Sequence, residues 1–171
     1  MLLFGHLGIA IGLAYLLDKS ILQRSKRRID YRFLLLGSIL PDLIDKPLSL
    51  AGIVGGRAIG HTLIFAIVVI ASVAVLESRG WKSGILLGIS LGIGTHLLLD
   101  TLWTNPEVLF WPALGFSFPT GGMNLDRLLH TLLTDPYVYG GEIIGMAMLI
   151  GFVANRRLYT RRGLRLFLSG Q

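Results

Sequence analysis

The stretch that decides the fold is Gly84–Trp103, GILLGISLGIGTHLLLDTLW. It is about as long as an apolar segment that crosses a bilayer as one helix. Yet it contains His96 and Asp100, which are four residues apart and therefore share one helical face. A carboxylate inside a membrane helix costs at least about 2.5 kcal/mol unless a partner offsets its charge. We interpret the pair as half of a cation site, with a hydrogen-bonded pair between helices as the alternative.

Three glycines precede this pair at a spacing of four residues, at Gly84, Gly88 and Gly92. Small residues at this spacing let a second helix approach closely. The seam they form drifts toward His96, so we expect a neighbouring helix to pack beside the cation site.

The composition is that of a membrane protein with several spans. Of the 171 residues, 53% are hydrophobic and 15% are charged, and the mean hydropathy is +0.67. We predict a single domain over residues 1–171, folded as an all-α bundle of about five transmembrane helices. The expected spans are Leu2–Leu17, Phe33–Leu50, His61–Leu76, Gly84–Trp103 and Gly141–Ala154.

Two further expectations concern the irregular parts of the chain. Pro41 and Pro47 fall inside the second span and are expected to break or kink it. Residues 104–140 are rich in proline, glycine and aromatic residues, and we interpret them as an interfacial lid with a short helix at Asn124–Leu133.

The net charge of +6 is concentrated between the apolar spans. Residues 18–32, 77–83 and 155–171 hold 13 of the 16 lysines and arginines. Five alternating spans place all three segments on one side, which the positive-inside rule makes cytoplasmic. The charge is then explained by topology, and we expect no nucleic-acid partner. Cysteine is absent, so the sequence has no disulfide and no thiolate ligand for a metal.

With this topology, four spans bring ionisable side chains to the outer, extracytoplasmic level. Imidazole and carboxylate ligands suit zinc, with manganese as the alternative, and a bridging carboxylate allows one or two ions. For single residues the simpler alternatives are a helix cap at Asp42 and an ion pair of Asp45 with Lys46 or Arg57. The candidate ligands, in chain order, are His6, Asp42, His61, His96 and Asp100.

Several of these residues lie in motifs that resemble a known family. The motifs are Gly37-Ser38-Ile39-Leu40-Pro41-Asp42, Arg57 followed by His61-Thr62, and His96-Leu97-Leu98-Leu99-Asp100 followed by Trp111-Pro112. They are similar to those of the membrane-bound, metal-dependent hydrolases of the YdjM (DUF457) family. The order of ligands also resembles one zinc site of the zinc-dependent phospholipase C and P1 nuclease superfamily, which is helical and hydrolyses phosphodiesters.

The resemblance and the location together predict a metal-dependent hydrolase in the cell membrane. We expect it to cleave a phosphoester, or another ester, of a membrane lipid or lipid-linked substrate. A pocket just below the headgroups is reached most easily by an amphiphile. Asp45, or a non-bridging carboxylate oxygen, is the expected proton acceptor. Arg57 is expected to bind substrate phosphate and stabilise developing negative charge, with balancing the charge of the aspartates as the alternative. The alternative is a metal-binding membrane protein without catalysis, such as a scaffold or a transporter subunit.

Overall fold

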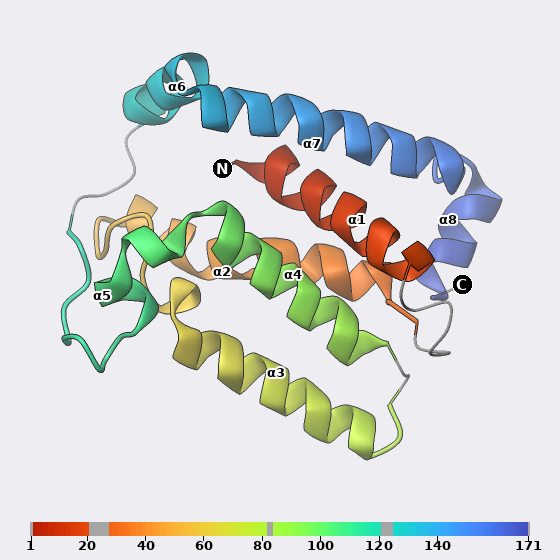
Figure 1. The fold of residues 1–171 in the computed structure, drawn as a ribbon, viewed down its shortest axis with the longest axis horizontal. Coiled ribbons are helices and arrows are strands. Elements are labelled where there is room, and N and C mark those ends of the chain that lie inside the picture. Colours follow the sequence, from red (N-terminus) through yellow and green to blue (C-terminus); the bar gives the residue numbers. More distant parts are fainter. Residues whose placement is uncertain (1, 21–27, 82–83, 121–124, 171) are drawn as a thin grey trace.

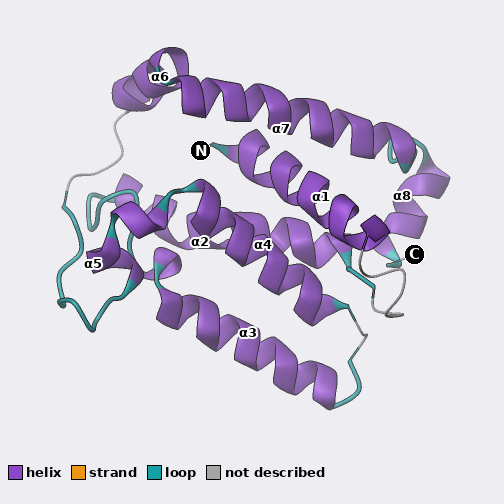
Figure 2. Cartoon of the chain, in the orientation of Figure 1, coloured by secondary structure: helices purple, strands orange, loops and turns teal. Residues whose placement is uncertain are grey.

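The computed structural model describes residues 2–20, 28–81, 84–120 and 125–170, which fold into helices and loops without any strand (Figures 1 and 2). The prediction of an all-α fold is therefore confirmed. The long helices are α1 (Leu3–Ser20), α2 (Tyr31–Leu50), α3 (Leu63–Ser78), α4 (Ile85–Leu99) and α7 (Pro136–Asn155). The shorter ones are η2 (Ile59–His61), η3 (Leu102–Thr104), α5 (Pro106–Leu109), α6 (Leu125–Thr134) and α8 (Arg161–Leu168).

The long helices lie side by side with alternating directions (Figure 1). α2 packs most extensively against α4, α1 packs against α7, and α3 packs against α4. α1, α3 and α7 begin at the end of the molecule where α2 and α4 finish. We call this end, which also carries α5 and α6, the α5 end, and we call the opposite end the α8 end.

Glycines set how closely α2 and α4 approach each other. A Cβ atom added at Gly88 would lie 2.5 Å from the carbonyl oxygen of Asp30, and one at Gly92 would overlap the carbonyl oxygen of Leu34. The predicted glycine seam is thus confirmed, and α2 is the helix that packs on it. This contact brings the last turn of α4, with His96, against the middle of α2.

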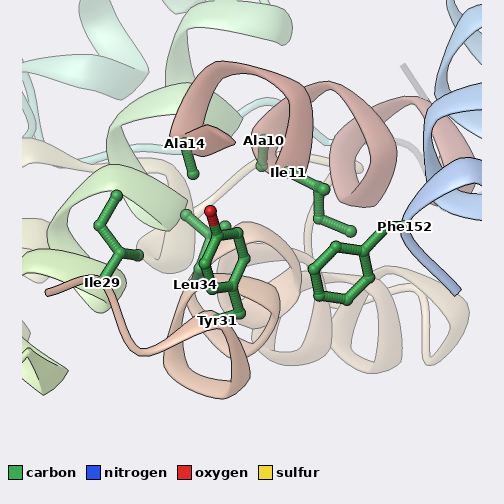
Figure 3. Close-up of a cluster of buried hydrophobic side chains, with 7 residues drawn as sticks. All are labelled: Ala10, Ile11, Ala14, Ile29, Tyr31, Leu34 and Phe152. Atoms are coloured by element: carbon green, nitrogen blue, oxygen red, sulfur yellow. The ribbon is translucent and has the colours of Figure 1, made fainter. Parts of the chain in front are cut away.

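A cluster of buried apolar side chains joins α1, the start of α2 and the end of α7 (Figure 3). The rings of Tyr31 and Phe152 stack with their centroids 5.3 Å apart. The other members are Ala10, Ile11, Ala14, Ile29 and Leu34. This apolar cluster includes no ionisable group of the predicted metal site, so the polar residues are gathered elsewhere in the bundle.

Helix α2 runs through both Pro41 and Pro47, so the expectation that they break the second span is wrong. A proline removes one backbone hydrogen bond, but it does not end a helix whose flanks are held by packing. Here the long contact with α4 holds the chain on both sides of Pro41. Asp42 and Asp45 therefore lie on regular helical turns rather than in an irregular break.

Other helix bounds also differ from those expected. His61 lies in η2 rather than at the start of a span, because α3 begins at Leu63. α4 ends at Leu99, with Asp100 as its C-cap, so Trp103 lies beyond the helix. α7 begins at Pro136 rather than Gly141, because the Asp135 side chain accepts the backbone N–H of Tyr137 and caps the helix. The basic tail forms α8, which sequence patterning did not indicate.

Helix α8 is tied to the start of α2. Arg32 donates from Nη1 to the carbonyl oxygen of Leu168 and from Nε to the Asp30 carboxylate, at 2.5 and 2.9 Å. The hydrogen bond from Arg32 holds the pKa of Asp30 below its usual value. These contacts close the α8 end of the molecule.

Length and composition identify one described helix, Pro136–Asn155, as both long enough and apolar enough to cross a membrane. Leu63–Ser78 and Ile85–Leu99 are apolar but shorter. Length and composition alone therefore do not establish the five predicted spans among the described helices.

Candidate metal centre

Three of the four histidines of the chain meet at the α5 end. His6 comes from the first turns of α1, His61 from the end of η2, and His96 from the last turn of α4. Each has an exposed fraction of 1% or less. Asp42 of α2 and Asp100, the C-cap of α4, complete the cluster. The structure thus brings together all five residues that the sequence suggested as metal ligands.

Two overlapping groups of these side chains have the spacing of a metal site. In one, ligand atoms of His6, His96 and Asp100 lie within 4.8 Å of one another, and in the other so do those of Asp42, His61 and His96. Nε2 of His6 is 3.2 Å from Oδ1 of Asp100. Nε2 of His61 is 3.5 Å from Oδ2 of Asp100 and 3.8 Å from Oδ1 of Asp42. Nε2 of His96 is 4.0 Å from Oδ1 of Asp42.

The hydrogen bonds behind two imidazoles fix which nitrogen faces the cluster. Nδ1 of His96 lies 2.7 Å from the backbone carbonyl oxygen of Ser38, which can only accept, so this nitrogen donates. Nδ1 of His61 lies 2.7 Å from Oδ2 of Asp45 and donates likewise. In the neutral rings, both Nε2 atoms therefore carry lone pairs, and these atoms are only 3.2 Å apart. Two facing lone pairs at this distance repel unless a proton or a metal cation lies close to both.

Asp45 is fully buried behind this cluster. Its Oδ2 accepts the backbone N–H of Ala58 at 2.6 Å in addition to Nδ1 of His61, and its Oδ1 accepts the N–H of Gly60 at 2.9 Å. A side chain at Gly60 would place its Cβ 2.5 Å from the carbonyl oxygen of Pro41, so glycine permits this close approach. The alternative in which Asp45 pairs with Lys46 or Arg57 is wrong, because these two cations bind other carboxylates.

Lys46 and Arg57 lie on the outer side of the cluster. Nζ of Lys46 is 2.5 Å from Oδ2 of Asp42, and Nε of Arg57 is 3.0 Å from Oδ2 of Asp100. The two cationic side chains are 34% and 36% exposed, whereas the carboxylates beneath them are 13% and 7% exposed. The cluster therefore opens to its surroundings past two positive groups.

His6 has buried ring nitrogens that remain unsatisfied. Neither nitrogen makes a well-aligned hydrogen bond to a described residue, although Nε2 lies 3.2 Å from Oδ1 of Asp100 and the ring stacks on His96 with centroids 4.0 Å apart. The start of α1 is held in place by Glu142 of α7, which accepts the backbone N–H groups of Leu2, Phe4 and Gly5 at 2.9 Å each. A buried imidazole that is positioned this firmly, with Nε2 beside a carboxylate and no well-aligned hydrogen bond, fits a metal ligand.

Comparison with known proteins adds a family to this geometry. A family model described as YdjM inner membrane protein matches residues 1–163. The chain belongs to the YdjM family. The same comparisons found no match among curated proteins or solved structures.

Membership in the YdjM family agrees with the predicted membrane location, since the family is one of inner membrane proteins. The family resemblance noted from the sequence motifs is thereby confirmed. The further similarity to the phospholipase C and P1 nuclease superfamily stays a prediction.

Sequence reasoning missed three contributions to the site of this YdjM protein. The carbonyl of Ser38 has no sequence signal as a hydrogen-bond acceptor. Lys46 did have a sequence signal as an ion-pair partner, because it follows Asp42 by four residues and so shares its helical face. Glu142 also had a sequence signal, since an acidic residue in the apolar segment 141–154 needs a partner that offsets its charge. The remaining histidine, His130, is exposed on α6 and takes no part in the cluster.

Proposed function

We propose that this YdjM protein is a metal-dependent hydrolase of the cell membrane that cleaves an ester, in particular a phosphoester, of a lipid or lipid-linked substrate. The observation that carries the proposal is the pair of Nε2 atoms of His61 and His96, 3.2 Å apart with both Nδ1 atoms donating elsewhere. A divalent cation between these atoms removes the repulsion and also gives His6 a partner.

The ligand chemistry favours a single ion. Each neutral imidazole offers one lone pair, and Nδ1 of His96 is already used by Ser38. The two groups of potential ligands share His96, so they cannot each bind an ion through it. The donor distances of 3.2 to 4.0 Å match ligands placed about 2 Å from a common centre. We infer one zinc ion, or a manganese ion, whose ligands come from His6, His61, His96, Asp42 and Asp100. Because their ligand atoms form two overlapping groups of three, the five do not all bind the ion at the same time.

Residues of the chain supply the other groups that hydrolysis needs, namely a proton acceptor and a cation. A divalent ion held by these ligands would lower the pKa of a bound water toward neutrality and polarise a phosphoryl oxygen. Asp45 has both oxygens occupied, so we assign it the positioning of His61 rather than proton transfer. The proton acceptor that we propose is Oδ2 of Asp42, the more exposed ligand carboxylate, which lies at the open side of the cluster and also contacts Lys46. Arg57 lies where it can stabilise developing negative charge.

The membrane placement follows from surface chemistry and helix direction. The outward side chains of α3 and α7 are apolar and large, including Ile67, Val68, Ile143 and Ile150 at 58–66% exposure. Lipid, rather than water, suits such a surface. We propose that the five long helices all span the bilayer, with the basic α8 end cytoplasmic. The site then faces the extracytoplasmic side, where a lipid headgroup can reach it.

Purified protein incubated with phospholipids and soluble phosphodiesters, with and without chelator, tests this function. We expect turnover that the chelator abolishes and that added zinc or manganese restores. His96→Ala should lose both the ion and the activity. His130→Ala, which removes the exposed histidine, should keep both. Turnover that the chelator does not affect, or no turnover of any ester by metal-loaded protein, would contradict catalysis.

One observation favours the second candidate, a metal site without catalysis. Structural zinc sites are closed, whereas catalytic ones keep a position open to substrate, and the three imidazoles here are almost completely buried. This candidate predicts that His96→Ala loses the ion and lowers the unfolding temperature, while wild-type protein loaded with one ion turns over no ester.

A further inference from the structure

The two ligand carboxylates share an arrangement that the metal alone does not require. Asp42 directs Oδ1 toward the histidines and Oδ2 toward Lys46. Asp100 has Oδ1 beside His6, and its Oδ2 lies beside Arg57 as well as 3.5 Å from Nε2 of His61. Each carboxylate thus contacts both the histidines of the cluster and a cation that is about one-third exposed. We call Lys46 and Arg57 together the cationic rim.

The rim retains donors that no described residue uses. The hydrogen bond to Asp100 occupies Nε of Arg57, and the described part of the chain shows no partner for its two terminal nitrogens. These nitrogens form the planar fork that binds two phosphate oxygens at once. Lys46 is held through one carboxylate oxygen, which leaves further N–H groups of its ammonium for a ligand.

Charge explains why a rim of this kind matters for substrate choice. Asp42, Asp45 and Asp100 together outweigh one divalent ion, so without the rim the centre would repel an anion. The two cations reverse that balance on the side from which a ligand approaches. A neutral carboxylic ester gains little from such a rim, whereas an anionic phosphoryl group gains a contact with each cation.

From this geometry we propose that Lys46 and Arg57 form a binding site for the non-bridging oxygens of a phosphoryl group. The substrate class is then an anionic phosphoester rather than a carboxylic ester. That last step rests on the proposed hydrolase function, but anion binding by the rim does not. The rim also positions the ligand carboxylates, and a test must separate this effect from binding.

The test measures binding without turnover. Metal-loaded protein in uncharged detergent micelles is titrated with inorganic phosphate, and separately with micelles containing phosphatidate. Acetate and a diacylglycerol with the same acyl chains serve as comparison ligands. We expect saturable binding of phosphate and phosphatidate, and none of acetate or diacylglycerol. Equal affinity for both phosphoryl ligands identifies the group itself as the recognised feature, and tighter binding of phosphatidate shows that the lipid contributes as well.

Substitutions then assign the binding to the rim. Lys46→Gln and Arg57→Gln should each weaken phosphate binding by about tenfold or more, because each removes a charge-assisted contact. Lys46→Arg, which keeps the charge, should retain much of the affinity. Arg57→Lys keeps the charge but loses the planar fork, so it should retain less affinity than wild type and more than Arg57→Gln. Arg79→Gln removes an exposed charge beyond α3, at the α8 end, and should change nothing.

Metal content, measured by elemental analysis, separates binding from carboxylate positioning. The Gln variants should keep their ion while losing phosphate affinity. Wild-type phosphate affinity in both Gln variants would overturn the proposal, and so would loss of the ion from both together with the phosphate. Neither result bears on whether the wild type hydrolyses esters. Conversely, absence of hydrolysis would overturn the proposed function and leave anion binding standing.

Discussion

Asp45 is the residue whose role the structure changes most. It holds His61 through Nδ1, and it accepts two backbone N–H groups from the turn before that histidine. Asp45→Asn replaces one acceptor oxygen by an NH₂ group. That group must either face the N–H of Gly60 or Ala58, or donate to Nδ1 of His61 and so move the ring proton to Nε2. Either arrangement disturbs the ligand.

We therefore expect Asp45→Asn to lower metal affinity by about 10- to 100-fold, as is usual for a partner that orients a ligating histidine. Competition with a chromogenic chelator measures this change. Glu107→Gln, which alters an exposed acid on α5, is the matched control. An unchanged affinity in Asp45→Asn would show that its contacts do not position His61.

At this scale the sequence identified the five candidate ligands that the structure brings together, but not the partners behind them. Candidate ligand residues can be recognised in the sequence, because an ionisable group in an apolar segment needs a partner that offsets its charge. The partners of His96 and His61 depend on tertiary contacts, a carbonyl in α2 and a turn folded over Asp45. Spacing along the chain contains no such information. For this reason Asp45 was expected to transfer protons, although its contacts indicate positioning.

Among the helices, the contact between α1 and α7 gives the clearest mutational test of packing, because this contact positions His6. A Cβ atom at Gly145 would overlap the backbone of Phe4, two residues before that histidine. Gly151, on the same helix, has nothing within 4 Å of the equivalent position. The two glycines therefore differ in packing while sharing the helical backbone of α7.

Gly145→Ala should reduce the free energy of unfolding by about 1–3 kcal/mol, because the added methyl group forces the helices apart. Gly151→Ala should be neutral, or stabilising by up to about 1 kcal/mol through helix propensity. Unfolding in mixed dodecyl sulfate micelles, followed by circular dichroism, compares the two. Equal effects would mean that α1 does not pack closely on α7 at Gly145.

Elements were predictable where one physical rule dominated. The glycine seam of α4 was predictable, because small residues spaced by four let a second helix approach closely. The structure places α2 against this seam. The prolines of α2 were misjudged because local backbone chemistry favours a break, while packing against α4 overrides it. α8 was missed because its eight residues, RRGLRLFL, were interpreted through their charge alone. Its helix depends on Thr160, whose side chain accepts the N–H of Gly163.

For the whole molecule, the alternating helix directions and the charge distribution independently support the membrane topology that we propose. The direction of each long helix comes from the fold, and the basic segments come from the sequence (Figure 1). Exposed arginines of α8 and of the turn before it lie at one end, and the candidate metal ligands lie at the other. If that arrangement sets orientation in the membrane, the two ends must be accessible from opposite sides.

The absence of cysteine from the sequence makes this directly testable. Ser78→Cys places a thiol at the end of α3, on the basic side, and Ser117→Cys places one in the loop after α5; both serines are exposed. An impermeant maleimide should label Ser117→Cys in intact cells. It should label Ser78→Cys only after the membrane is opened, because positive segments are retained in the cytoplasm. The parent protein, without a thiol, gives the background. The reverse pattern would place the metal ligands at the cytoplasmic face, and a substrate from the outer leaflet could not then reach them.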